Sequence, residues 1–296
     1  MVALNQEFEA TKAWAQEVCL RKKSLGGFFI FNKKEGPVEK TVLPSLLQAC
    51  GAVVLALGLS MPVSAAIPLI TDDTGTQGKG KFQCELAGEY SHDEAESVTN
   101  RSSDLSATLT YGPIDAVDIV LSIPYQAWGT EDSGAEQRGS GISDIAVETK
   151  WRFYEQGGLS LALKPGLTIP TGNEEKELGN GKMTYYLYFI ASGERNPWAF
   201  HLNLAYIRND NTEDDRKDIW RASFASTVDL LKNVKLAADA GVESNADSAS
   251  KTPLVYMLVG LIYSPRADFD IGLGVKGGLT RPEPDVAVRG GITYRF

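Results

Sequence analysis

Ionisable residues recur at every second position in several stretches of the sequence, which places them on one face of an extended chain. Between residues 144 and 153, Glu148, Lys150 and Arg152 share a face in this way. Charges of both signs on one face can line an aqueous path and orient a polar solute, or can pair into a structural network. Nine residues are therefore candidates for lining the interior of a closed sheet: Glu148, Lys150, Arg152, Lys164, His201, Arg221, Asp239, Lys276 and Arg289.

Only two histidines are present, which restricts the catalytic chemistry open to the chain. A lipase built on a membrane β-barrel would need a Ser and His pair at its lipid-facing surface. His92 follows Ser91, but no His-x-Ser-Asn-Gly motif surrounds it. His201 is one of the nine residues assigned to the interior of the closed sheet, not to its outer surface. We predict no catalytic residues and no enzymatic activity, with a lipase as a remote alternative.

Cysteine and glycine patterns do not indicate a metal or nucleotide site. The three cysteines, Cys19, Cys50 and Cys84, lack metal-site spacing. The glycine-rich stretch 74–80 lacks the GxxxxGK[ST] spacing of a phosphate loop, and no helical pattern follows it. No metal and no cofactor are predicted. The net charge of -9 disfavours nucleic acid as a partner.

The elements that carry the candidate residues are predicted to be β-strands, because apolar and polar residues alternate along most of the chain from residue 81. Val147, Trp151 and Phe153, for example, share the face opposite Lys150. Most such segments have the length of a tilted membrane-crossing strand, about 9–11 residues. The segments span 81–91, 102–112, 115–126, 142–154, 158–169, 182–192, 197–208, 218–230, 233–243, 253–264, 267–280 and 286–296.

The connections between these segments alternate in length. Short turns are predicted near 112–115, 155–158, 192–197, 231–233 and 264–267. Longer polar loops are predicted at 92–101, 127–141, 170–181, 209–217 and 244–252, with a shorter one at 281–285. This alternation is typical of outer-membrane barrels. We predict an all-β fold: a transmembrane antiparallel up-and-down β-barrel of about 12 strands over residues 81–296, with both ends on the short-turn side.

A bilayer explains why such a sheet should close. Backbone N–H and C=O groups find no water in the hydrocarbon region, so every strand edge must be paired. The outward face must be apolar, while the interior can be polar. A mean hydropathy of -0.16 fits this arrangement, because only alternate residues would face lipid. The sequence therefore predicts a protein of a Gram-negative outer membrane, with membrane lipids as partners.

The chain before residue 81 is predicted to have three parts. Residues 41–66 read as a signal peptide, with an apolar core at 53–59 and small residues before a cleavage site after Ala65 or Ala66. A buried helix or a single anchor is the alternative. Residues 1–40 fit neither a signal nor a barrel and are interpreted as a non-native or disordered extension. Residues 67–80 form a glycine-rich segment that either folds into the lumen or remains a flexible periplasmic tail.

The last strand ends on an aromatic residue. Ile292, Tyr294 and Phe296 lie on one face of this strand. An aromatic residue that closes an amphipathic strand is similar to the signal read by the outer-membrane insertion machinery. We predict that this machinery is a partner through Phe296.

Two stretches carry a resemblance to a known family. The first is Ile70–Phe82, ITDDTGTQGKGKF; the second is Leu163–Glu175, LKPGLTIPTGNEE, followed by LGNGK at 178–182. They resemble the bacterial outer-membrane transporter family labelled "putative MetA-pathway of phenol degradation", over about residues 67–296. The resemblance implies an outer-membrane barrel that takes up small compounds, including aromatic ones.

Two readings of the whole barrel stay open. It is either a channel or transporter through which small organic solutes pass, or a structural or adhesive barrel with a closed lumen. The acidic long loops are likewise either sites for divalent cations that bridge lipopolysaccharide or solvated surface.

Overall fold

The computed structural model describes residues 67–95, 98–212, 215–281 and 283–296. The expected extension 1–40 and signal peptide 41–66 lie outside these ranges. Within the described ranges, no helix is long and apolar enough to span a membrane.

Thirteen antiparallel strands and one short helix make up the described chain. The strands are β1 (Phe82–Ala95), β2 (Val98–Ile114), β3 (Val117–Asp132), β4 (Ala135–Ile142), β5 (Ile145–Gln156), β6 (Leu159–Ile169), β7 (Thr184–Arg195), β8 (Trp198–Arg208), β9 (Asp218–Leu231), β10 (Val234–Glu243), β11 (Leu254–Arg266), β12 (Phe269–Gly278) and β13 (Val286–Arg295). A 3-10 helix, η1, spans Glu174–Lys176.

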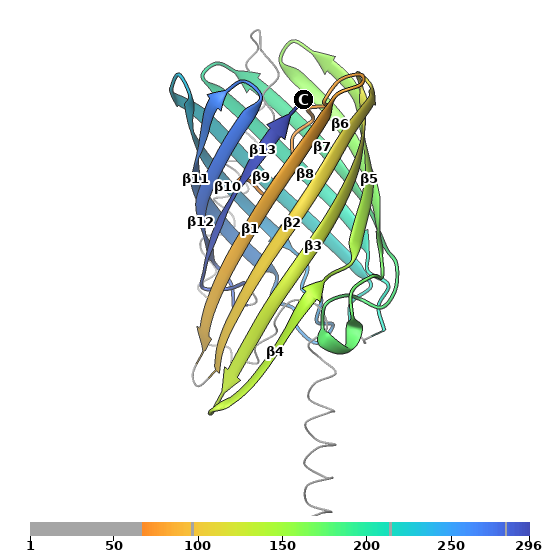
Figure 1. The fold of residues 1–296 in the computed structure, drawn as a ribbon, viewed down its shortest axis with the longest axis vertical. Helices are drawn as coiled ribbons and strands as arrows, with labels where there is room; N and C mark the ends of the chain where they lie inside the picture. Colours follow the sequence, from red (N-terminus) through yellow and green to blue (C-terminus); the bar gives the residue numbers. More distant parts are fainter. Residues whose placement is uncertain (1–66, 96–97, 213–214, 282) are drawn as a thin grey trace, which may run out of the picture.

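All of these strands except β4 form one closed ring (Figure 1). Each ring strand pairs with its neighbours in the sequence, and β3 pairs with β5. The ring closes where β1 pairs with β13, with Gln83 opposite Arg295 and His92 opposite Val286. The prediction of an antiparallel up-and-down barrel of twelve strands is confirmed.

Two of the predicted long loops are wrong in detail, because they are β-hairpins. β1 and β2 stay paired as far as Ala95 opposite Val98, so 92–95 and 98–101 are strand rather than loop. β3 continues to Asp132 and returns as β4, which covers most of the expected loop 127–141. Ser133 and Gly134, with φ of 49° and 86°, make the tight turn. Both faces of these extensions are polar, so no apolar alternation marked them.

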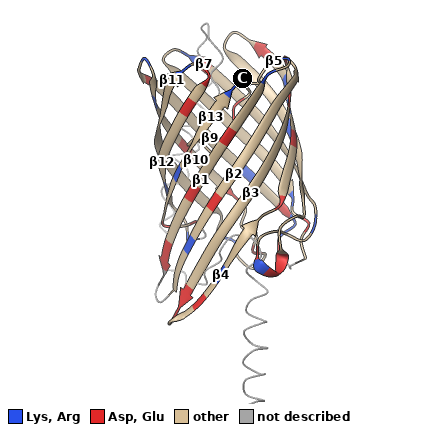
Figure 2. Cartoon of the chain, in the orientation of Figure 1, with Lys and Arg blue, Asp and Glu red and all other residues tan. Residues whose placement is uncertain are grey.

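The outward side of the ring is apolar and the inward side is polar, the reverse of a soluble protein. On β12, Leu273 is 62% exposed, whereas the inward-facing Lys276 is 7% exposed. On β5, Trp151 is 50% exposed and Lys150 is 8% exposed. Figure 2 shows acidic residues at the long-loop end, on the β3–β4 hairpin and at η1.

The C-terminal residue lies at the seam of the ring. Phe82 and Phe296 exchange two backbone hydrogen bonds, with N···O distances of 2.8 and 2.9 Å. Their rings stack with centroids 5.6 Å apart, and Tyr294 stacks on Phe296 at 5.5 Å. Phe296 therefore joins the first strand to the last. Its recognition by the insertion machinery stays a prediction.

Candidate functional site

Residues 67–80, called here the lumen segment, lie inside the barrel, which is one of the two alternatives left open by the sequence. The segment begins against β11 and β12, where glycines leave room for it. A Cβ at Gly260 would lie 2.5 Å from Cγ of Pro68, and a Cβ at Gly272 would overlap the backbone of Ile67. Leu69 packs against Ala225, Ala237 and Ile262 in a small buried cluster. Because these two glycines have no side chain, the barrel wall has room for the start of the segment.

Asp239 on β10 anchors the next two residues. Its Oδ2 accepts the backbone N–H groups of Ile70 and Thr71 at 2.7 and 2.8 Å. Its Oδ1 accepts the Thr71 hydroxyl at 2.7 Å and the Tyr256 hydroxyl at 3.1 Å. Four donors therefore satisfy a carboxylate that is almost wholly buried.

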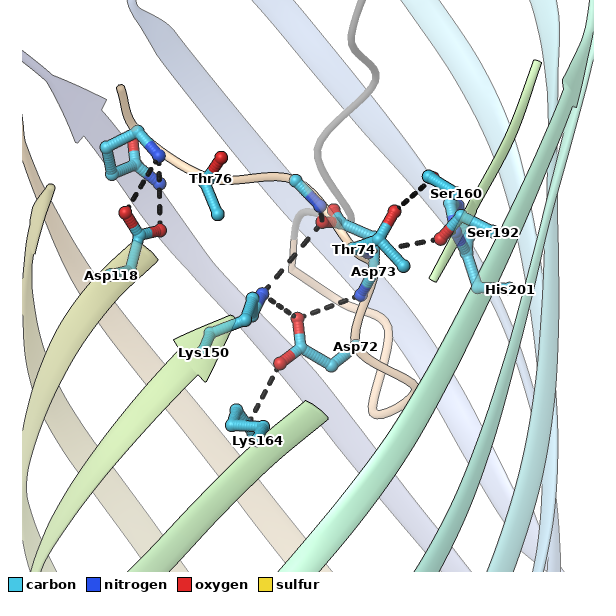
Figure 3. Close-up of polar contacts among 12 residues, drawn as sticks. Asp72, Asp73, Thr74, Thr76, Asp118, Lys150, Ser160, Lys164, Ser192 and His201 are labelled. Carbon is cyan, nitrogen blue, oxygen red and sulfur yellow. Dashed lines mark hydrogen bonds and ion pairs between the residues drawn. The ribbon is translucent and has the colours of Figure 1, made fainter. Parts of the chain in front are cut away.

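Asp72 lies between two lysines of the opposite wall (Figure 3). Its carboxylate is 2.7 Å from Nζ of Lys150 and 2.9 Å from Nζ of Lys164. Asn203 exchanges two hydrogen bonds with the Asp72 backbone, at 2.8 and 2.7 Å. Burial, the largest effect, raises the pKa of Asp72, but the two lysine charges and their hydrogen bonds together hold it well below its usual range. Asp72 is therefore charged at neutral pH and couples the segment to β5, β6 and β8.

Pro165 helps to explain why the two lysines meet there. The β5–β6 ladder pairs Glu148 with Gly166 and resumes at Trp151 with Leu163, leaving out the residues between. Pro165 has no N–H to donate, so the ladder is interrupted beside it. Lys150 and Lys164 lie at this interruption. Pro165 lies within β6, and the register of the ladder is the same on both sides of this gap.

The middle of the segment docks through hydroxyl groups. The backbone N–H of Thr74 donates to Oγ of Ser192 at 3.1 Å, and its hydroxyl bonds to Ser160. Ser192 Oγ lies 2.9 Å from Nδ1 of His201. His201 is 1% exposed and faces the lumen, so it does not lie at the lipid-facing surface that a lipase would need.

Asp73 has fewer hydrogen-bond donors to its carboxylate than Asp72 has. Its Oδ1 accepts the Gly75 N–H at 2.5 Å and lies 4.0 Å from Nζ of Lys150. Its buried Oδ2 has no hydrogen-bond partner among the described residues. Burial is the largest cause that raises the pKa of Asp73, and the neighbouring Asp72 carboxylate adds to it.

The far end of the segment reaches the short turn between β2 and β3. The N–H of Gln77 donates to both oxygens of Asp118 at 3.0 and 3.1 Å. The N–H of Lys79 donates to Asp115 at 2.9 Å, and that of Gly80 to the carbonyl of Gly112 at 2.7 Å. The segment therefore crosses the lumen from the wall at β11 and β12 to that at β2 and β3.

The nine candidate residues fall into three groups. Around the segment lie Glu148, Lys150, Lys164, His201 and Asp239; Lys164 also pairs with Glu148 at 3.3 Å. Nearer the long loops lie Arg221, Lys276 and Arg289. Arg152 lies nearer the short turns, 3.2 Å from Glu155. Their role toward a solute stays a prediction.

Several interior residues were not among the candidates. Thr71, Asp72 and Asp73 belong to a stretch without strand periodicity, so alternation could not assign them a face. Glu89 lies 2.6 Å from Lys276 and 3.3 Å from Arg289. Its position in β1, two residues from the inward-facing Ser91, was the available signal.

Two cavities flank the lumen segment. The inner cavity, about 230 Å³, lies between the segment and the wall of β1, β2, β3, β5 and β6. The outer cavity, about 840 Å³, lies at the long-loop end and is lined by residues of η1 and of the loops around it. Ile70 and Arg289 line both, so the cavities adjoin at these side chains. Among the described residues, no cluster of three His, Cys, Asp or Glu side chains could hold a metal ion.

Residues 68–296 match the family described as "Putative MetA-pathway of phenol degradation". The chain belongs to this family. The resemblance noted in the two glycine-rich motifs is thereby confirmed. The sequence has no significant match among the curated proteins.

Solved structures with similar folds include outer-membrane porins and a channel. The NanC porin is 12% identical with a TM-score of 0.49, over 71% of this chain and 98% of the porin. The KdgM porin is 11% identical with a TM-score of 0.47, over 72% and 99%. The CymD monoaromatic hydrocarbon channel is 9% identical with a TM-score of 0.42, over 74% and 89%.

Proposed function

We propose that this protein is an outer-membrane channel through which small organic solutes, including aromatic compounds, pass along the lumen segment. The observation that carries the proposal is the pair of adjoining cavities inside the ring. A solute that enters from the long-loop end meets the outer cavity first and then the narrower space beside the segment.

The two faces of the barrel support a membrane location. A closed ring leaves no unpaired strand edge to lipid, and its outward face carries large apolar side chains along most strands. A barrel of twelve strands is also wider than the 8-stranded kind that side chains fill, and narrower than a 16-stranded porin. Room for a chain segment and for a small solute beside it follows from this width.

The lining of the outer cavity supports an aromatic solute. Tyr186, Tyr188, Tyr256 and Trp128 contribute rings to it, and Ile219 and neighbouring aliphatic residues contribute apolar surface. The Tyr186 and Tyr188 rings meet edge to face at 5.8 Å. Such rings can stack on a planar solute. The family description, which refers to phenol degradation, points to the same class of solute.

Planar-bilayer recording of the purified protein tests the proposal. We expect a small single-channel conductance for the intact protein and a larger one after deletion of residues 67–76, because the lumen segment occupies the path. Deletion of residues 130–137, the tip of the β3–β4 hairpin, is the control, because none of these eight residues lines either cavity, and conductance should stay unchanged.

Liposome swelling with phenol-sized solutes extends the test from ions to organic molecules. Absence of conductance and of swelling, in the intact and the 67–76-deleted protein alike, would overturn the channel and favour a structural or adhesive barrel with a closed lumen.

A further inference from the structure

Carboxylates outnumber cationic side chains in the lining of both cavities, and therefore along the whole proposed path. Four cationic side chains line the outer cavity: Arg221, Lys276, Arg281 and Arg289. Nine carboxylates line the same cavity: Glu89, Asp93, Asp104, Asp144, Glu174, Glu175, Glu177, Glu243 and Glu283.

Each of the four cations is already engaged by a carboxylate. Arg221 pairs with Glu243, and Arg281 lies 3.8 Å from Asp285. Lys276 and Arg289 share Glu89, at 2.6 and 3.3 Å. An anion that entered the cavity would therefore have to displace a carboxylate to reach a positive charge.

Several carboxylates of the outer cavity, by contrast, have no cationic partner, or only a distant one, among the described residues. Asp93, Asp104, Glu174 and Glu175 line the cavity and form no ion pair with any described residue. Glu283 is 7% exposed, and its Oε2 is a buried atom with no hydrogen-bond donor in the described chain. The nearest cation to that oxygen is Lys276 at 3.6 Å, which lies closer to Glu89.

The aromatic lining provides a second, independent preference for cations, because the face of an aromatic ring is negative. Two of these rings already hold ammonium groups. Nζ of Lys276 lies 5.9 Å from the centroid of Tyr256, and Nζ of Lys164 lies 5.2 Å from that of Tyr188.

The excess of carboxylates over cationic side chains continues past Ile70 into the inner cavity. Lys150 and Lys164 there are both held by Asp72. Glu85 and Asp118 line this cavity without an ion pair in the described part of the chain; Asp118 accepts only the Gln77 N–H at the segment. Every cationic side chain that lines the path lies within 4.0 Å of a carboxylate, although Nε of Arg289, which shares Glu89 with Lys276, has no hydrogen-bond acceptor among the described residues.

We infer that the channel selects for small organic cations, passes neutral solutes, and discriminates against anions. The inference rests on the proposed function and names its substrate class by charge. A wall of fixed negative charge in a confined space concentrates cations and excludes anions, and the effect weakens as salt screens it.

The test is the reversal potential of the full chain in neutral phosphatidylcholine bilayers across a KCl gradient. We expect a permeability ratio of K⁺ to Cl⁻ above one. In phosphatidylcholine liposomes, benzyltrimethylammonium should enter faster than benzenesulfonate, an anion of similar size. A triple variant, Asp104→Asn with Glu174→Gln and Glu175→Gln, should lower the ion ratio at least about twofold, because it removes the charge of three of the nine carboxylates that line the outer cavity.

The matched control is Glu131→Gln with Asp132→Asn and Glu136→Gln, which removes three exposed carboxylates on the β3–β4 hairpin outside both cavities. This variant should keep the wild-type ratio, and circular dichroism should show the same β content for all three proteins. Conductance with a ratio at or below one, or an equal shift in both variants, would overturn the charge preference alone. Absence of conductance would defeat the proposed function and this inference with it.

Discussion

At the scale of single residues, small side chains and buried carboxylates decide how the lumen is occupied. Gly260 and Gly272 open the wall to Pro68 and Ile67, while Asp239 offers the acceptors that the segment's backbone needs. A hydrogen bond to a charged group contributes about 1.5–3 kcal/mol. The docking of the segment is therefore the sum of a few identifiable contacts, each open to substitution.

Gly272→Ala should displace the start of the lumen segment, because the new Cβ would overlap the Ile67 backbone. We expect it to weaken docking on the order of 1–3 kcal/mol, the usual cost of overpacking, and to raise conductance. Gly193→Ala is the matched control: it makes the same change in a strand where a Cβ meets no atom within 4 Å. Equal conductance in the two variants would contradict this account of the wall.

The raised pKa of Asp73 predicts that docking of the lumen segment in the barrel depends on pH. Burial raises the pKa of this carboxyl in the docked segment, so docking favours the protonated form. Docking is then fully stabilised below the ordinary pKa of an aspartate and weakens as the pH rises through the raised value. Conductance should therefore rise between mildly acidic and alkaline pH. Asp73→Asn, which cannot ionise, should remove this rise, and an unchanged pH profile in that variant would refute the assignment to Asp73.

At the scale of elements, the strands differ in length more than their apolar stretches do. β2 and β3, of 17 and 16 residues, continue past the apolar belt as polar extensions. In these extensions β2 still pairs with β1 and β3, and β3 pairs with β2 and β4. Backbone hydrogen bonds persist there because the partner strand is already aligned by the barrel below. The rim of the outer cavity is thus partly built of β-structure, with η1 held to it by a bond from Nε1 of Trp128 to the Lys176 carbonyl at 3.0 Å.

Phe296 belongs to this scale, because it joins β13 to β1. Phe296→Ala removes the stacking on Phe82, worth about 0.5–1.5 kcal/mol, and removes the terminal aromatic signal. If the insertion machinery reads this residue, assembly in cells should fall much more than refolding of the purified protein into liposomes. Phe82→Ala removes the same stacking and leaves the C-terminus intact. Equal defects of the two variants in cells would show that only the stacking matters.

At the scale of the whole molecule, the barrel is stabilised by its surroundings in opposite ways on its two faces. Large apolar side chains such as Leu273 and Val275 are exposed outward, while charged groups such as Lys276 are enclosed. In water such a surface would associate; in a bilayer it is solvated. The polar interior, satisfied by ion pairs and by the lumen segment, would be unstable only if it were left dry and unpaired.

Charges placed on the outward face should therefore be penalised according to depth. Leu273→Arg, in the middle of β12, should cost about 2–4 kcal/mol of folding free energy in lipid vesicles. Leu231→Arg, at the end of β9 beside a short turn, should cost roughly 0–1 kcal/mol. Denaturant titration of both variants measures the difference. Equal costs would argue against a membrane around this belt.

The sequence by itself determined the number of ring strands and the two faces of each, because alternation is a local property that survives into any sheet. It also supplied the interior charges on the strands, such as Lys150, Lys164 and Asp239. Only the tertiary structure decided what those charges meet. The lumen segment has no periodicity, and its place depends on partners far along the chain: Asp72 is 78 residues from Lys150 and 131 from Asn203. The closed ring brings these partners together. The sequence therefore left two places open for residues 67–80, the lumen or a periplasmic tail, and the tertiary structure decided for the lumen.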